Sequence, residues 1–179
     1  MFITKTPQIA NWAAAQADLD FYLQNRPWPM WNQLGLTYRP GAEDQCLDAH
    51  GSLYDKDKQE FIAKESDFTE WTGLVGDYTK NRILELAETE GFKVGRVRYM
   101  RQMPKNGLSV HTDMEQRYHL VLSTNPHAFF GRTVDNGEVK ASCYHIPADG
   151  HFYKVDTTQE HFVYNGGWEP RIHLVICAV

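Results

Sequence analysis

The second half of the chain is a series of short apolar runs separated by turn signals, and this pattern constrains the fold most. Seven runs rich in β-branched and aromatic residues follow Gly91: KVGRVRYMRQM, LSVHTD, RYHLVLS, ASCYHI, HFYKVD, EHFVYN and RIHLVICAV. Turn residues separate them, as in MPKNG, STNP, DNG, PADG and NGGWEP. The series predicts a mainly β fold with supporting helices, built on an antiparallel sandwich of the double-stranded β-helix (jelly-roll, cupin-like) type.

The first half indicates helices and loops. Thr6 followed by Pro7 is typical of a helix start, and the apolar spacing after it predicts a helix over residues 7–25. A proline- and glycine-containing loop follows, with one short strand near residues 36–38. The spacing predicts a second helix over residues 77–90 that ends at Gly91. Its expected inward residues are Ile83, Leu84 and Ala87.

These elements fit a single domain over residues 1–179. Residues 1–92 would supply helical and loop support, and residues 93–179 the jelly-roll core. The loop over residues 39–72 is a possible lid, because long loops often wall a pocket and close over it.

Composition excludes several classes of partner. The formal net charge of −5 gives no basic footprint for nucleic acid or an anionic membrane. The opening MFITKTPQIANW lacks the apolar run of a signal peptide, and no later stretch is long and apolar enough to span a bilayer, so we expect a cytoplasmic protein. Cys46, Cys143 and Cys177 fit neither a disulfide framework nor a zinc site, and we interpret them as free thiols.

The triplet HTD in the second predicted strand is a candidate metal site. Side chains alternate along a strand, so His111 and Asp113 would project from one face. Together with a second histidine, they would form the facial triad of a non-haem Fe(II) oxygenase. His161 is the best candidate for that histidine, because it lies in a late strand and Arg171 follows ten residues later.

The register of the last two strands tests this pairing. If these strands form a hairpin, Arg171 shares a face with His161 only when its partner has an odd number. With Asn165 opposite, the two residues would lie roughly 13 Å apart, and with Val163 opposite about 7 Å. Either spacing leaves room for a short dicarboxylate between the metal and the guanidinium.

The segments MPKNGLSVHTD, RYHLVLSTN and ADGHFYKVDTTQEHFVYNGGWEPRIHLVI together resemble the catalytic core of the aspartyl/asparaginyl β-hydroxylase family of Fe(II)/2-oxoglutarate oxygenases. The resemblance covers about residues 94–176. It implies that His111, Asp113 and His161 bind Fe(II) and that Arg171 holds the distal carboxylate of 2-oxoglutarate. Arg117 and His119 match the RxH element of the family, which implies that they also help to bind the cosubstrate.

The resemblance further implies a reaction. The enzyme would hydroxylate an unactivated C–H bond with O2, releasing succinate and CO2, on a small-molecule amino acid or on an Asp/Asn-type side chain of a peptide or protein. Some family members have glycine at the position of Asp113, whereas this chain keeps the carboxylate. The alternative is a cupin-like metalloprotein with a non-oxidative or ligand-binding role, which would depend on metal without forming succinate.

Other residues leave their roles open. His145 and His151 flank the IPADG turn and are a weaker rival metal pair, because no carboxylate and arginine accompany them. His173 can face the pocket or pack in the core. Arg96 and Arg98 share a strand face, where they can meet a substrate carboxylate or form an ordinary solvated basic surface.

Overall fold

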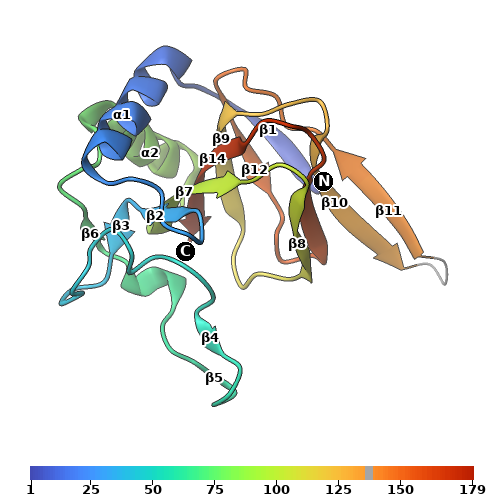
Figure 1. Cartoon of the computed structure of the whole chain (residues 1–179), viewed down its shortest axis with the longest axis horizontal. Helices are drawn as coiled ribbons and strands as arrows, with labels where there is room; N and C mark the ends of the chain where they lie inside the picture. The colour runs from blue at the N-terminus through green and yellow to red at the C-terminus, as the bar shows by residue number, and fades with distance from the viewer. Residues whose placement is uncertain (136–138) are drawn as a thin grey trace.

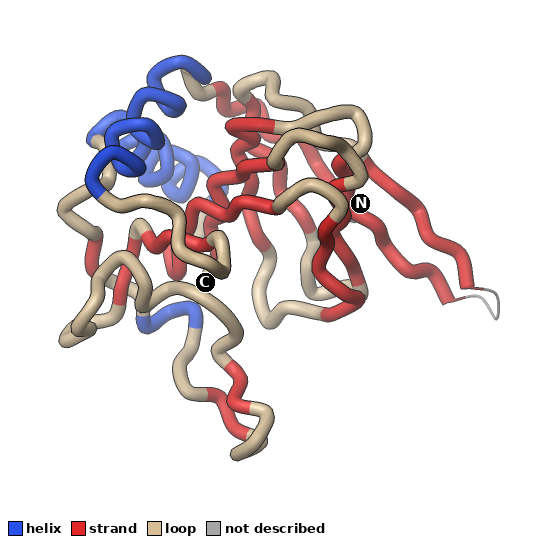
Figure 2. Tube along the Cα trace, viewed as in Figure 1, coloured by secondary structure: helices blue, strands red, loops and turns tan. Residues whose placement is uncertain are grey.

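The computed structural model describes residues 1–135 and 139–179, and their strands form two facing sheets (Figures 1 and 2). The helices are α1 (Trp12–Asn25), η1, a 3-10 turn (Glu65–Asp67), and α2 (Asp77–Glu90). The strands are β1 (Ile3–Ile9), β2 (Gln33–Gly35), β3 (Thr37–Tyr38), β4 (Tyr54–Asp55), β5 (Glu60–Phe61), β6 (Glu70–Trp71), β7 (Val94–Gln102), β8 (Asn106–His111), β9 (Arg117–Ser123), β10 (Ala128–Asp135), β11 (Val139–Tyr144), β12 (His151–Val155), β13 (His161–Asn165) and β14 (Arg171–Ala178). The turn expected at DNG falls largely on residues 136–138, outside the described part of the chain.

The larger sheet has six strands in the order β1-β12-β9-β14-β7-β2, and the smaller has four in the order β11-β10-β13-β8. Every neighbouring pair in both sheets is antiparallel. The remaining pairs, β3–β6 and β4–β5, are short ribbons in the loop region. The mainly β fold with a jelly-roll core is therefore confirmed.

Alternation along the central strands of the larger sheet separates apolar from polar side chains. On β9, Tyr118, Leu120 and Leu122 belong to the core cluster that also holds helix residues, whereas Arg117 and His119, which alternate with them, line a cavity. On β14 and β7, apolar residues of the core cluster likewise alternate with polar residues. The inner face of this sheet consequently carries a set of buried polar side chains, namely Arg96, Arg98, His119, Arg171 and His173.

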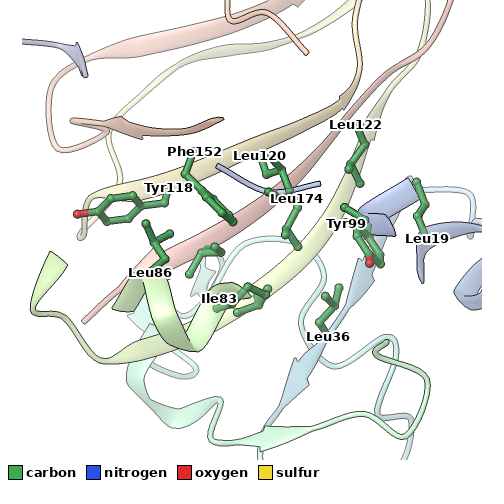
Figure 3. Close-up of a cluster of buried hydrophobic side chains, with 14 of the residues drawn as sticks. Leu19, Leu36, Ile83, Leu86, Tyr99, Tyr118, Leu120, Leu122, Phe152 and Leu174 are labelled. Carbon is green, nitrogen blue, oxygen red and sulfur yellow. The ribbon is translucent and has the colours of Figure 1, made fainter. Parts of the chain in front are cut away.

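The two helices cover the outer face of the larger sheet. Leu19 of α1 and Ile83 of α2 are fully buried against the strands (Figure 3). Tyr22 of α1 is fully buried in the same cluster. A smaller apolar cluster includes Phe130 and Val163 of the smaller sheet with Val121 of the larger one, and so joins the two sheets. The packed helices leave the inner face of the sheet to the polar residues.

The expected first helix is only partly correct. Residues 3–9 form β1, which pairs with β12 at the edge of the larger sheet, and the helix begins at Trp12. Its N-cap is Asn11, whose side-chain oxygen accepts a hydrogen bond from the backbone of Ala14 at 3.2 Å. The Thr6–Pro7 pair imitates a helix start locally, but the edge of the sheet supplies partners that a helix would not use.

The second helix is confirmed at residues 77–90, and Gly91 follows it with φ of 72°. One of its expected inward residues is wrong, because Leu84 is 43% exposed. Leu86 is buried in its place. In the second half, all seven expected strands are present, and β10 is an additional strand. Its signal, AFFGRTV, is interrupted by Gly131, beside which the ring of Phe162 packs.

No helix among the described residues is long and apolar enough to cross a membrane.

Candidate metal centre and adjoining cavities

Pairing of β13 with β8 brings two histidines together. His161 at the start of β13 is the direct partner of His111, the last residue of β8. Asp113 lies just beyond the strand, where its backbone N–H donates to the carbonyl of Thr157 at 2.8 Å. Strand alternation is therefore not what places Asp113 beside His111. The turn after β8 does so, anchored to the loop that leads into β13.

The three side chains form a group that fits a metal ion. One ligand atom of each of His111, Asp113 and His161 lies within 4.8 Å of the other two. Nε2 of His161 is 3.6 Å from Oδ2 of Asp113, and Nε2 of His111 is 4.0 Å from Oδ1. Among the described residues, this is the only group of three or more histidine, cysteine or carboxylate side chains so arranged. Two imidazoles and a carboxylate suit a divalent iron, manganese or zinc ion.

Hydrogen bonds orient both histidines for this role. Nδ1 of His111 donates to the carbonyl of Ser109 at 2.7 Å, and Nδ1 of His161 donates to the carbonyl of Gln159 at 2.9 Å. With the proton on Nδ1, each ring presents the lone pair of Nε2 toward the carboxylate. Burial lowers the pKa of His161 below its ordinary value, which favours the neutral, metal-binding form.

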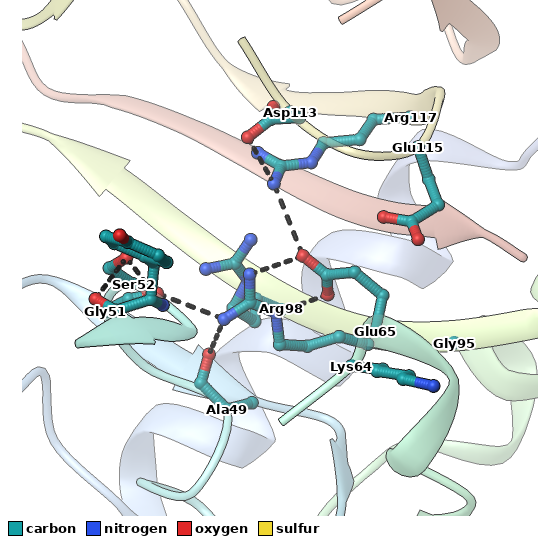
Figure 4. Close-up of polar contacts among 12 residues, drawn as sticks. Ala49, Gly51, Ser52, Lys64, Glu65, Gly95, Arg98, Asp113, Glu115 and Arg117 are labelled. Carbon is teal, nitrogen blue, oxygen red and sulfur yellow. Dashed lines mark hydrogen bonds and ion pairs between the residues drawn. The ribbon is translucent and has the colours of Figure 1, made fainter. Parts of the chain in front are cut away.

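Asp113 is held by a chain of charges that reaches into the loop region (Figure 4). Arg117 donates to Asp113 Oδ1 at 2.7 Å and lies 3.5 Å from Glu65. Oδ2 of Asp113 is buried and has no hydrogen-bond partner among the described residues. Because a buried carboxylate oxygen is costly when it is bare, this atom is the one left to a metal ion.

Glu65 is a member of this site that the sequence did not reveal. It lies in η1, accepts two hydrogen bonds of 2.6 Å from Arg96, and ties residues 39–72 to the larger sheet. Burial alone would raise the pKa of Glu65, but the Arg96 guanidinium lowers it below its usual value. Nothing in KESDFT separates Glu65 from a solvated acidic residue, so no local signal identifies it.

A cavity of about 260 Å³ opens between the sheets beside the histidines. Arg171 is buried in its wall, with its guanidinium 5.0 Å from the centre of the Phe130 ring. Nη2 of Arg171 donates to Nδ1 of His173 at 3.0 Å, and no carboxylate pairs with it among the described residues. Burial lowers the pKa of Arg171 to about 9. An unpaired, buried guanidinium in a cavity wall is suited to an anionic ligand.

His119 also lines this cavity, and His173 contacts both His119 and Arg171. The Nδ1 atoms of the two rings are 3.4 Å apart, and their Nε2 atoms are buried without a hydrogen-bond partner among the described residues. Burial, reinforced by the nearby Arg171, holds the pKa of both rings well below the ordinary value. His173 thus faces the polar interior and not the apolar core. The cavity offers the buried Arg171 guanidinium and the neutral ring of His119, beside Arg117, which is already paired with Asp113. This set suits a small anionic ligand.

The expected hairpin between the last two strands is wrong. β13 belongs to the smaller sheet and β14 to the larger one, where Arg171 pairs with Gln102 of β7. His161 and Arg171 nevertheless line the same cavity, because they come from opposite sheets and both project into the sandwich. The juxtaposition depends on how the two sheets pack and not on strand register.

A second cavity of about 560 Å³ shares His111 and Arg117 with the first. Asp113 lines it as well, and the loop residues Leu53, Tyr54 and Phe61 form part of its wall. Arg96 and Arg98 lie beneath it, at 3% and 2% exposure. The interpretation of these arginines as a solvated surface is therefore wrong.

The rival histidine pair has a simpler explanation. His145 and His151 use Nδ1 to contact the backbone carbonyls of Ala128 and Thr6, at 2.8 and 3.0 Å. Neither belongs to a metal-binding group among the described residues.

Comparison with solved structures agrees with the fold. The chain is similar to an oxidoreductase of the 2OG-Fe(II) oxygenase family from Burkholderia pseudomallei, with a TM-score of 0.58 and 15% identity, over 99% of this chain and 84% of the other. It is similar to AviO1 from Streptomyces viridochromogenes Tue57, with a TM-score of 0.57 and 12% identity, over 99% and 89% of the two chains. A Pseudomonas putida prolyl-4-hydroxylase gives a TM-score of 0.53 at 12% identity, over 99% and 91%.

Sequence comparison gives the family. No curated protein sequence shows a significant match to the chain. The family model described as aspartyl/asparaginyl beta-hydroxylase matches residues 8–179, nearly the whole length, and includes the three candidate ligands as well as the two cavities. The chain therefore belongs to the aspartyl/asparaginyl β-hydroxylase family.

Proposed function

We propose that the protein is an Fe(II)- and 2-oxoglutarate-dependent dioxygenase that hydroxylates an unactivated C–H bond of an amino acid or of an Asp/Asn-type side chain. The reaction consumes O2 and releases succinate and CO2. One observation, made on the described residues, carries the proposal: a two-histidine, one-carboxylate group whose carboxylate oxygen Oδ2 has no hydrogen-bond partner adjoins a cavity whose wall holds a buried arginine with no carboxylate partner. Membership of the hydroxylase family supports it.

Each residue has a defined task in this proposal. His111, Asp113 and His161 hold Fe(II), which supplies the activation of O2 and of the C–H bond. The backbone carbonyls of Ser109 and Gln159 keep both imidazoles in the metal-binding tautomer.

The first cavity would bind the cosubstrate. Arg171 pairs with the distal carboxylate of 2-oxoglutarate, and His173 fixes the guanidinium by accepting one of its N–H groups. His119 lines the same cavity and offers a buried ring nitrogen to the cosubstrate. Arg117 also borders this cavity, but its guanidinium is only 2.7 Å from Asp113, which supports a role other than cosubstrate binding. Its main task is to hold the metal-binding carboxylate in place.

An anaerobic titration of the purified protein with Fe(II) and 2-oxoglutarate tests the proposal. We expect the visible metal-to-ligand charge-transfer band of the ternary complex in the wild type. We expect His161→Ala to lose it and His145→Ala, which alters a histidine outside the site, to keep it. With O2 and candidate substrates, proton NMR should then show succinate.

Two outcomes would contradict the proposal. If the wild type binds iron with no band at saturating 2-oxoglutarate, the cupin-like, non-oxidative alternative takes its place. If His145→Ala loses the band as fully as His161→Ala, the iron site has been misplaced.

A further inference from the structure

The second cavity carries a buried charge that the protein does not neutralise. Arg98 donates from Nη1 to Oε1 of Gln33 at 2.9 Å, which is its only side-chain hydrogen bond among the described residues. Its Nε atom is buried without a partner. Burial, with Arg96 and Arg117 nearby, lowers the pKa of Arg98 to about 9. The guanidinium still carries its charge at neutral pH, where an isolated buried charge is costly.

The charges lining this cavity do not balance. Three arginines and two carboxylates face it: Arg96, Arg98, Arg117, Glu65 and Asp113. Glu65 is occupied by the two 2.6 Å bonds from Arg96, and Asp113 is paired with Arg117. In the part of the chain that the structure describes, Arg98 is left without a carboxylate partner. A metal ion on Asp113 would add further positive charge, so the imbalance would grow when the site is loaded.

The unpaired edge of Arg98 has the geometry for a carboxylate. The bond to Gln33 uses Nη1 and leaves Nε and Nη2, which can grip a carboxylate through two parallel hydrogen bonds. Gln33 is itself fixed, since its Oε1 also accepts the backbone N–H of Gly51 at 3.1 Å. The guanidinium is therefore held in one orientation before any ligand arrives.

The cavity also has the size and the walls of a small-molecule site. Its volume of about 560 Å³ lies in the range of ligand pockets. Leu53, Tyr54 and Phe61 supply an apolar wall. His111 and Asp113 line the same space, so a molecule anchored on Arg98 extends toward the metal cluster.

We propose that this second cavity is the substrate site and that Arg98 binds a carboxylate of a small amino-acid substrate. The inference rests on the proposed function, because it assigns the substrate class of that same site. Arg98 selects an anionic group that Glu65 and Asp113 cannot replace, since both are already paired. The loop that carries Tyr54 and Phe61 covers the rest of the molecule.

The probes are the twenty common L-amino acids. For each one that binds, we would also test the same compound with each carboxylate in turn converted to a carboxamide. Binding would be measured by anaerobic titration calorimetry, first to the protein loaded with Fe(II) and 2-oxoglutarate and then to the metal-free protein. We expect at least one amino acid to bind, and one specific amidation to weaken its binding at least tenfold.

The variants locate the effect. We expect Arg98→Gln to weaken binding of that amino acid at least tenfold and to make the amidation harmless, because no guanidinium remains to distinguish the two. Arg98→Lys should retain part of the affinity. Arg82→Gln, on the outside of α2, should match the wild type. If Arg98→Gln does not fold, the amidation series on the wild type and Arg98→Lys still decide the matter.

Failure of this inference is distinguishable from failure of the proposed function. If the charge-transfer band forms but no amino acid binds, or binding is indifferent to both amidation and Arg98→Gln, the substrate assignment is overturned and the oxygenase stands. If the band never forms while Arg98-dependent binding of an amino acid persists, the oxygenase fails and the carboxylate site stands.

Discussion

The two cavities beside the histidines each contain a buried arginine that has no carboxylate partner within residues 1–135 and 139–179, but they are built differently. The Arg171 cavity is walled mainly by strands of both sheets, whereas residues 51–65 supply a large part of the wall around Arg98. Strands in a packed sandwich hold a fixed geometry, and loops tolerate variation. On the proposed function, the site for the common cosubstrate would lie in the rigid core, and the site for the individual substrate would be bounded by a loop segment that tolerates variation.

His111→Ala should impair the function of both cavities, because this side chain lines each of them. If His111 is a metal ligand as proposed, its removal should lower the affinity for Fe(II) by more than the roughly 10–100-fold loss that is typical when an outer partner of a ligand is removed. Anaerobic calorimetry measures the loss, with His145→Ala as the matched control. If His111→Ala kept the wild-type affinity for Fe(II), the metal would not bind at the residue that the two cavities share.

Phe130→Ala and Phe61→Ala test whether the two walls differ in their contribution to stability. Phe130 is 3% exposed between the sheets, and Phe61 is 55% exposed on the loop. We expect Phe130→Ala to lower the free energy of unfolding by about 3–5 kcal/mol, and Phe61→Ala by less than about 1 kcal/mol. Urea unfolding of both variants gives the comparison. Equal losses would show that the loop wall is as firmly packed as the core.

Arg171→Ala and Arg98→Gln should separate the two arginines by ligand. Truncating one member of a buried, hydrogen-bonded charge pair costs about 2–5 kcal/mol. Arg171→Ala should therefore weaken 2-oxoglutarate binding by roughly 30-fold or more. Arg98→Gln should leave it nearly unchanged, as measured by the charge-transfer band across a 2-oxoglutarate titration. A comparable loss in both variants would mean that the cavities act as one site.

The neutral histidines give the Arg171 cavity a pH signature. Their pKa values in the folded protein are depressed below 6.5, so the unfolded chain binds more protons once the pH falls below that value. Stability should thus be level above about pH 6.5 and decline below it, by up to about 1.4 kcal/mol per pH unit for each ring. His173→Gln keeps an acceptor for Arg171 and removes one of the two protonating rings. It should therefore reduce the slope of the decline by up to about 1.4 kcal/mol per pH unit. Urea unfolding at pH 7.5, 6.5 and 5.5 measures the slopes, and an unchanged slope in the variant would show that His173 is protonated when folded.

The sequence predicted the elements of the second half well because each strand carries its own alternation and is bounded by its own turn residues. It was misled where the environment overrode a local signal. Thr6 and Pro7 suggest a helix start, but β12 offers an edge on which residues 3–9 pair as a strand. Leu84 fits the apolar spacing of α2, yet its side chain is 43% exposed.

The candidate site divides in the same way. HTD, His161 and Arg171 were visible as residue types at informative spacings, and their roles remain proposals. The contribution of Glu65 was not visible, because it depends on a contact across 31 positions with Arg96. The buried state of Arg98 was also hidden, since a strand pattern of alternating arginines is equally typical of a solvated face.

By itself, the sequence determined the fold class, the family and the residues suited to hold a metal, because these follow from local periodicity and from motifs along one stretch of chain. Only the tertiary structure decided that His161 and Arg171 line one cavity from opposite sheets, that Glu65 is committed to Arg96, and that Arg98 has no carboxylate partner among the described residues. The physical reason is that burial and charge pairing are properties of neighbours brought together by packing, and neighbours distant in sequence leave no local trace.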